Sequence, residues 1–385
     1  MHILANVIYQ VFSSMGISSK IIIILSLLAS VGLMSRCAIN SHNDDDYTFA
    51  WDMSVENHTG VPKNNFDKDG KHRGMSIFNL DGDKDQWINQ LVKNNIECAA
   101  LVPFLYQRTD TTKIIRQRDD YTSWSTYDSM YIDIIDRLHE RQLHVMLKPH
   151  LWMNEGWRSN IKLDNDQEWD VWFDSYRNHM LHYARIAQDQ NVELYCIGTE
   201  FNSSINRQPD RWLALVHEIK AIYSGKLTYA ANWDGEFRNV QFWDEMDYIG
   251  IQAYFPLTSK DRPSLREIKN GWKKHKQMLR KLSEVHDKPI LFTETGYRSD
   301  QSATIKPWEW SGRIDTLNDI TCYDTQNLAY EALFQELWRE EWFAGMYFWQ
   351  WHTETKETDR HERNDFTPRF KPAENTMAKW YGQGI

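Results

Sequence analysis

The chain has 385 residues with a formal net charge of −10, enough for one large domain or two small ones. Its acidic balance, with no basic stripe, argues against a nucleic-acid partner, because phosphate backbones are bound by clustered Lys and Arg. Tryptophan and tyrosine, at 18 each, exceed ordinary usage. Such rings more often fill a core, but they also stack on the apolar faces of sugars, so the composition mildly favours a carbohydrate binder.

The N-terminus has the pattern of an export signal. Lys20 precedes an apolar run, Ile21 to Met34, which has the length of a signal-peptide core and is short for a membrane span. Cys37 follows as in a bacterial lipoprotein cleavage site, except that Arg36 replaces the usual small residue. We expect an exported protein, held at the cell envelope by lipid on Cys37, or secreted after a later cut, or kept as an uncleaved signal anchor.

The remaining sequence divides at about residue 72. Residues 1–37 are the predicted signal, residues 38–71 are a polar tether and lead-in, and residues 72–385 are the predicted catalytic domain. If Cys37 carries lipid, only Cys98, Cys196 and Cys322 remain, and their spacing is not that of metal ligands. At most one disulfide is then possible, and redox chemistry is not expected.

Short apolar runs alternate with amphipathic stretches along this domain. The predicted strands are Gly74–Phe78, Cys98–Leu105, His144–His150, Glu193–Glu200, Lys226–Asn232, Tyr248–Tyr254, Pro289–Glu294 and Gly345–Trp351. The clearest predicted helices are Ser129–Arg141, Gln167–Asp189, Asp210–Tyr223, Ser264–Val285, Thr325–Glu341 and Ala373–Tyr381. Eight such units, without the glycine-rich phosphate loop of a doubly wound sheet, predict an α/β fold with a single (β/α)8 barrel of the TIM type.

Two of the predicted strands end in glutamate. Glu200 closes the fourth run and Glu294 closes the seventh, and the carboxyl ends of barrel strands are where active sites lie. Each follows an apolar strand, whereas the surface glutamates of this chain sit among Lys and Arg on helices. Hydrolysis of a glycosidic bond needs two carboxyls on opposite sides of the sugar, one to protonate the leaving oxygen and one to attack or to activate water.

The motifs around these residues point to a family. The strings ALVPFLYQ, HVMLKPHLW, ELYCIGTEF, MDYIGIQAYFPL, KPILFTETGYRS and FAGMYFWQW resemble glycoside hydrolase family 113 of clan A, from Gly74 to Tyr381 in the right order. That family is known for β-1,4-mannanase activity. The resemblance implies that Glu200 is the acid/base, that Glu294 is the nucleophile, and that configuration is retained. Retention requires carboxyls about 5 Å apart.

One position departs from the clan. Many clan A families place Asn directly before the acid/base, where it contacts the substrate 2-hydroxyl, but here Thr199 occupies that position. Asn232 and Asn202 are the alternative partners for this hydroxyl, which is axial in mannose.

Other strand ends supply candidate substrate contacts. Tyr254 is placed to hydrogen-bond Glu294 and hold it ionised, with a half-buried rim aromatic as the alternative. At the end of strand eight, the resemblance implies a Trp floor under the reacting sugar, for which we favour Trp349, while Trp351 fills either this role or the core.

Strand three ends in Lys148, His150 and Trp152, which supply a cation, an imidazole and a ring for sugar hydroxyls and faces, or serve structural roles. Arg108 and Asn232 are weaker candidates of the same kind. Without paired histidines or an Asp-rich loop, metal catalysis is disfavoured, and we expect no cofactor.

Strand alternation adds a prediction about the barrel interior. If Glu200 points into the mouth, Gly198 and Cys196 lie on the same inward face, and Ile290 and Phe292 fill the layers beneath Glu294.

These features predict a retaining, monomeric glycoside hydrolase that acts on a mannan or glucomannan polysaccharide or oligosaccharide. Within enzymes, another β-glycanase or an exo-acting β-mannosidase is the alternative. Outside enzymes, the alternative is a surface glycan-binding lipoprotein without catalysis, against which the presence of both glutamates argues.

Overall fold

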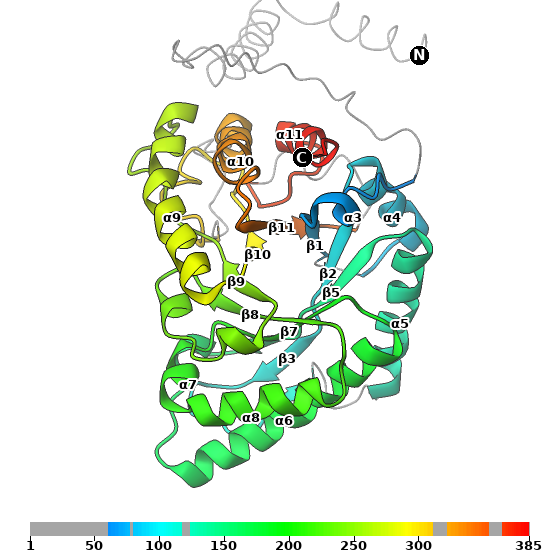
Figure 1. The fold of residues 1–385 in the computed structure, drawn as a ribbon, viewed down its shortest axis with the longest axis vertical. Helices are drawn as coiled ribbons and strands as arrows, with labels where there is room; N and C mark the ends of the chain where they lie inside the picture. Colours follow the sequence, from blue (N-terminus) through cyan, green and yellow to red (C-terminus); the bar gives the residue numbers. More distant parts are fainter. Residues whose placement is uncertain (1–60, 78–79, 118–123, 311–321, 354–363, 385) are drawn as a thin grey trace, which may run out of the picture. The chain divides into compact units, whose positions relative to one another are not determined.

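The computed structural model describes residues 61–77, 80–117, 124–310, 322–353 and 364–384, so the predicted signal and Cys37 lie outside the described residues. Eight parallel strands close into a barrel, as predicted (Figure 1). Around the barrel they are β1 (His72–Ile77), β11 (Phe343–Trp351), β10 (Ile290–Thr295), β9 (Tyr248–Gln252), β8 (Lys226–Asn232), β7 (Leu194–Thr199), β5 (His144–Leu147) and β2 (Cys98–Leu101).

Helices surround the strands (Figure 1). They are α3 (Phe66–Asp69), α4 (Lys84–Lys93), α5 (Trp124–Glu140), α6 (Asp166–Asp189), α7 (Asn202–Arg207), α8 (Pro209–Lys220), α9 (Leu265–His286), α10 (Tyr323–Leu337) and α11 (Pro372–Tyr381). The predicted helices are all found, within a few residues at most ends. The described residues also form three 3-10 helices. η1 (Arg158–Asn160) precedes α6, and η2 (Glu236–Arg238) and η3 (Trp243–Glu245) connect β8 to β9 without an α-helix.

The helix ends follow from local sequence. At the start of α9 the Ser264 hydroxyl accepts from the Glu267 amide at 3.3 Å, and the Glu267 carboxylate accepts from the Ser264 amide at 2.9 Å. This reciprocal cap satisfies two amides that the helix itself leaves unpaired. At α6 the Asn165 side chain accepts from the Glu168 amide at 3.0 Å. Both caps begin helices where the apolar periodicity predicted them.

The second and third predicted strands are each split in two. β2 and β5 end before Pro103 and Pro149, and the chain resumes as β3 (Phe104–Gln107) and β6 (His150–Met153). These two pair with each other and with β4 (Arg116–Gln117) in a separate three-stranded sheet. Proline cannot donate to a ladder and restricts the residue before it, so the barrel pairing stops there. His150 and Trp152 therefore stand on this small sheet, beyond the barrel wall.

Most of the aromatic excess fills the core. Fully buried tryptophans include Trp87, Trp172, Trp212, Trp243, Trp272, Trp338 and Trp351. The barrel interior holds a cluster of mostly small and aliphatic side chains: Cys98, Ala100, Met146, Leu194, Cys196, Ala230, Leu291, Ala344 and Tyr347. The large rings thus lie between strands and helices, and smaller side chains fill the barrel. The strand ends remain free to hold polar groups.

The predicted alternation along β7 is right for Cys196, which lies inside the barrel, and wrong for Gly198. A Cβ on Gly198 would come within about 3.0 Å of Trp212 and Tyr229 and 3.1 Å of the Tyr176 hydroxyl, in the layer between barrel and helices. The β7–β8 register shifts between Cys196 and Thr199, so the inward and outward faces exchange.

The same correction applies beneath Glu294. Leu291, and neither Ile290 nor Phe292, belongs to the interior cluster, and Phe292 instead stacks on Trp272 of α9 with ring centroids 6.0 Å apart. In the β9–β10 pairing the register shifts between Phe292 and Glu294, so these two residues do not share a face of the strand as simple alternation requires.

Candidate active site

Two buried glutamates lie at the carboxyl ends of β7 and β10. Glu200 follows the last residue of β7 and is 7% exposed, while Glu294 is the penultimate residue of β10 and is 6% exposed. The backbone of Glu200 has φ of 56°, a left-handed conformation that only a constraining environment holds in a residue with a Cβ. Its amide donates to the Ala230 carbonyl at 2.9 Å, so the turn is tied to β8.

Glu294 is surrounded by donors. The Lys148 ammonium donates to Oε2 at 2.8 Å and the Gln252 amide at 3.0 Å, and the Tyr254 hydroxyl donates to Oε1 at 2.5 Å. Burial raises the pKa of Glu294, but the charge and hydrogen bond of Lys148, with the bonds from Tyr254 and Gln252, outweigh burial and leave it lowered. Glu294 is therefore held as an anion, the form that a nucleophile needs. The hydrogen bond predicted between Tyr254 and Glu294 is confirmed.

Glu200 has two side-chain partners. Asn232 Nδ2 donates to its Oε1 at 2.7 Å, and the Arg158 guanidinium contacts its Oε2. Arg158 Nε also donates to the Thr199 carbonyl at 3.0 Å, so η1 is joined to the end of β7. Both carboxylate oxygens are thus positioned, by two donors where Glu294 has three.

The two carboxyls share an electrostatic neighbourhood at the mouth. Burial raises the pKa of Tyr254 well above its ordinary value, and the charges of both Glu294 and Glu200 raise it further. Tyr254 packs with Val102, Trp349 and Phe366 in an apolar cluster. An anionic carboxylate and a second carboxyl beside an apolar wall are the arrangement that glycosidic bond cleavage requires.

His150 is a buried imidazole without a hydrogen-bond partner in the described part of the chain. It is 7% exposed, it stacks on Phe104 at 5.8 Å, and within the described ranges neither ring nitrogen makes a hydrogen bond. Burial and the charges of Arg158 and Lys148 lower the pKa of His150 well below 6.5, so the ring is neutral. A neutral imidazole has one donor and one acceptor, which suits a sugar hydroxyl.

The other predicted substrate residues lie in different settings. Lys148 is fully buried and its ammonium contacts Gln252, Thr293 and Glu294, so its three donors act on the protein. Asn232 is likewise committed, since it donates to Glu200 and accepts from the Asp234 amide at 2.8 Å. Both residues position carboxyls.

Two of the three predicted tryptophan contacts are buried and one is exposed. Trp349 lies in the apolar cluster beside Tyr254, as a floor residue would. Trp351 is fully buried under the Arg369 guanidinium at 5.4 Å, which fits the core-filling alternative. Trp152 on β6 is 54% exposed, and Arg108 is exposed just beyond β3.

Three residues of the site escaped the sequence reasoning: Gln252, Arg158 and Glu236. Gln252 ends β9, so the strand-end rule used for Tyr254 was enough to find it. Arg158 lies in a short 3-10 turn with no motif around it, and Glu236 lies four residues past the end of β8. Neither carries a local signal, because Arg158 acts on the end of β7 and Glu236 accepts hydrogen bonds from β8.

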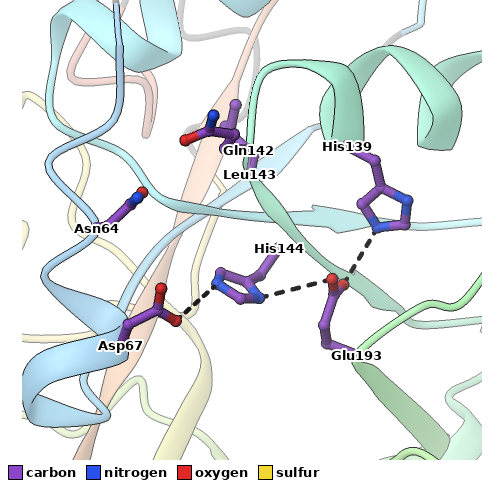
Figure 2. Close-up of a pocket in the computed structure, with 7 residues that line it drawn as sticks. All are labelled: Asn64, Asp67, His139, Gln142, Leu143, His144 and Glu193. Atoms are coloured by element: carbon purple, nitrogen blue, oxygen red, sulfur yellow. Dashed lines mark hydrogen bonds and ion pairs between the residues drawn. The ribbon is translucent and has the colours of Figure 1, made fainter.

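A second cluster of titratable groups lies at the opposite end of the barrel (Figure 2). A pocket of about 370 Å³ is lined by Asn64, Asp67, His139, Gln142, Leu143, His144 and Glu193. Glu193 contacts His139 at 3.3 Å and His144 at 3.6 Å, and His144 lies 3.9 Å from Asp67. This pocket is at the amino ends of β5 and β7, away from the strand ends where barrels carry out chemistry, so we do not assign the reaction to it.

The described part of the chain has neither a metal-ion site nor a membrane-spanning helix. No group of three or more His, Cys, Asp or Glu side chains there is arranged to hold a metal ion. Nor does any helix in those ranges have the length and apolar character needed to cross a membrane.

A closed parallel barrel with two buried carboxyls at the carboxyl ends of its strands has the groups that a glycoside hydrolase needs. The model of Glycoside Hydrolase Family 113 matches residues 80–371, and the chain belongs to this family. The resemblance seen in the sequence is thereby confirmed. No curated protein sequence matches the chain.

Solved structures agree. The GH113 β-mannanase AaManA from Alicyclobacillus acidocaldarius, in complex with ManMIm, is 26% identical over 81% of this chain and 97% of its own, with a TM-score of 0.71. A GH113 β-1,4-mannanase solved as a complex is 24% identical over 81% of this chain and 99% of its own, with a TM-score of 0.70. A β-glucuronidase from Faecalibacterium prausnitzii, 14% identical over 81% of this chain and 49% of its own, shares the fold alone, with a TM-score of 0.53.

Proposed function

We propose that this glycoside hydrolase is a retaining β-1,4-mannanase that cleaves mannan or glucomannan within the chain. The observation that carries the mechanism is the asymmetry of the two carboxyls. Glu294 accepts from an ammonium, an amide and a hydroxyl, whereas Glu200 has an amide and one guanidinium. The mannanase titles of the most similar solved structures support the substrate class.

In the proposed double displacement, ionised Glu294 attacks the anomeric carbon while protonated Glu200 gives its proton to the leaving oxygen. The glycosidic C–O bond breaks as the C–O bond to Glu294 forms. Glu200, now a carboxylate, then takes a proton from water, and that water displaces Glu294 with net retention. His150 is placed to bind a hydroxyl of the sugar, Trp349 supports its ring, and exposed Trp152 stacks on a more distant unit.

Azide rescue tests both assignments. We expect E294A to lose at least about a thousandfold in turnover while keeping its fold, since the covalent intermediate is lost. With a dinitrophenyl β-mannobioside, azide should rescue E294A by attack from the vacated face, giving the α-glycosyl azide. E200A should instead give the β-glycosyl azide, because azide then attacks the intermediate on Glu294. Full activity in either variant, or the same azide from both, contradicts the mechanism.

Product sizing on mannan, glucomannan, xylan and cellulose tests the substrate. A mannanase releases oligosaccharides of several lengths from mannan or glucomannan. Mannose alone would indicate an exo-β-mannosidase, and preference for xylan or cellulose would indicate another β-glycanase. Binding of mannan oligosaccharides without hydrolysis would support the non-catalytic alternative.

We also propose that the enzyme is exported and carries lipid on Cys37. The apolar run from Ile21 to Met34 followed by Cys37 supports this. Metabolic labelling with a palmitate analogue should mark the wild type in the membrane fraction and leave C37A unlabelled. An unlabelled wild-type protein in the culture medium would indicate secretion without an anchor.

A further inference from the structure

A third buried carboxyl lies behind the proposed acid/base. Glu236 in η2 is 2% exposed, and it follows Gly235, whose φ of 90° gives the turn that brings η2 back to the end of β8. Its Oε1 accepts from the Tyr229 hydroxyl at 2.5 Å and its Oε2 accepts from the Asn232 amide at 2.8 Å. Burying a carboxyl costs free energy unless such donors surround it. A role in filling space alone is therefore a poor explanation for Glu236.

These bonds close a ring around Glu200. Asn232, whose backbone is held by Glu236, donates from its side chain to Glu200 Oε1 at 2.7 Å. On the other side, the Tyr229 hydroxyl donates to Glu236 and accepts from the Phe201 amide at 2.7 Å. That amide belongs to the peptide just after Glu200, whose backbone is in the left-handed region. Glu236 therefore holds the Glu200 side chain through one arm and its strained backbone through the other.

Arg158 holds the other side-chain oxygen of Glu200, Oε2. Burial raises the pKa of Glu236 to about 8, against the hydrogen bonds from Tyr229 and Asn232, and the charge on Glu200 raises it further. The titratable groups facing Glu236 are thus Tyr229, Glu200 and Arg158. Because burial disfavours its charged form, Glu236 acts on Glu200 through its two hydrogen-bonded arms.

We propose that Glu236 is a positioning residue that fixes the acid/base Glu200 through Asn232 and Tyr229. The inference rests on the proposed function, because it takes Glu200 as the acid. It assigns no contact with substrate to Glu236.

The effect should appear only where a leaving group needs a proton. In E236Q, kcat/KM for mannan oligosaccharides should fall about 10- to 100-fold, within the range that general acid catalysis contributes. With dinitrophenyl β-mannobioside, whose leaving group departs without a proton, kcat/KM should fall less than about threefold. In Y229F, which removes the hydroxyl that joins Glu236 to the Phe201 amide, the loss should likewise be larger for mannan oligosaccharides than for dinitrophenyl β-mannobioside.

Glu97 offers a matched control. It is 2% exposed at the other end of the barrel and accepts from the Asn65 and Phe66 amides at 2.9 and 2.7 Å. E97Q should lower the melting temperature without changing the ratio of kcat/KM between the two substrates. If E236Q behaves like E97Q, or loses activity on both substrates equally, Glu236 is only structural and the inference is overturned.

The position of Glu200 separates this inference from the proposed function. In a crystal structure of E236Q, the Glu200 carboxyl should leave the position in which Asn232 holds it in the wild type. A Glu200 that stays in place overturns the inference. A wild type that cleaves neither substrate overturns the proposed function instead, and the crystal structure still decides the place of Glu236.

Discussion

The two ends of the barrel both carry clusters of acidic and basic side chains, but the clusters differ in what is left unpaired. At the amino end, around the pocket of Figure 2, Glu193 contacts His139 and His144 and accepts from the Val145 amide at 2.8 Å. At the carboxyl end, His150 is buried with both ring nitrogens unbonded within the described ranges. Within the described ranges, each histidine of the amino-end cluster lies 3.3 to 3.9 Å from a carboxylate, although His144 Nδ1 makes no hydrogen bond, whereas His150 is paired with no carboxylate.

The exposure of the charges differs in the same way. The Glu193 side chain is 38% exposed, whereas that of Glu294 is 7% exposed and its partner Lys148 is fully buried. Interactions among exposed charges are weakened by water, and buried ones are not. The pocket at the amino end is therefore a surface feature, whereas the buried charges at the carboxyl end interact in the low-dielectric environment that catalysis uses.

The largest expected effect comes from breaking the ion pair at the carboxyl end. K148M leaves buried Glu294 without its cation, which should cost about 3–5 kcal/mol in the free energy of unfolding. Because Lys148 lowers the pKa of Glu294, its loss should raise that pKa and move the acidic limb of kcat/KM to higher pH. Urea unfolding and a pH–rate profile measure the two effects.

The double variant K148M/E294Q controls for lost packing. It removes the uncompensated charge, so it should recover most of the stability that K148M loses while remaining inactive. An acidic limb that stays in place in K148M would show that Lys148 does not govern the ionisation of Glu294.

A pair of histidine substitutions sharpens the comparison. H150F removes an unpaired buried imidazole, so stability should be kept or increased while kcat/KM falls about tenfold through the loss of one hydroxyl contact. H144F at the other end should lower stability and leave kcat/KM unchanged. Contacts with Glu193 and Asp67 raise the pKa of His144 despite its burial. Its contribution to stability is therefore present below the ordinary pKa of 6.5 and is lost as the pH rises through the raised value.

Melting temperatures at pH 5 and pH 8, with kcat/KM at each pH, compare the two variants. H144F should be destabilised more at pH 5 and should keep wild-type kinetics. A kinetic defect in H144F as large as that of H150F would break the distinction between the two ends.

The smallest effect is expected from E193Q. Burial raises the pKa of Glu193, but the bonds from His139, His144 and the Val145 amide lower it to about 2. Its contribution to stability is thus present above the ordinary pKa of 4.5 and is lost as the pH falls towards 2. Because the side chain is 38% exposed, screening should hold the change at neutral pH below about 1 kcal/mol. Thermal unfolding should show a smaller difference between E193Q and the wild type at pH 3 than at pH 7.

The order of elements was readable from the sequence because it depends on neighbours along the chain. Apolar runs of strand length and amphipathic helices predicted all eight barrel strands. The rule that strand ends meet at one mouth then singled out Glu200 and Glu294, and it predicted the bond from Tyr254. Alternation within strands was less reliable, because single-residue register shifts turned Gly198 and Phe292 to the helix layer.

Only the tertiary structure decided which groups control the two carboxyls. Lys148 reaches Glu294 across 146 residues, and Arg158 reaches Glu200 across 42. Lys148 looked like a sugar contact in the sequence, and Arg158 and Glu236 carried no pattern. A hydrogen bond or a pKa depends on distance and burial in space, and closing the barrel creates both between residues whose sequence neighbours say nothing about their partners. The sequence by itself determined the barrel and the two glutamates, while folding determined how each is charged and held.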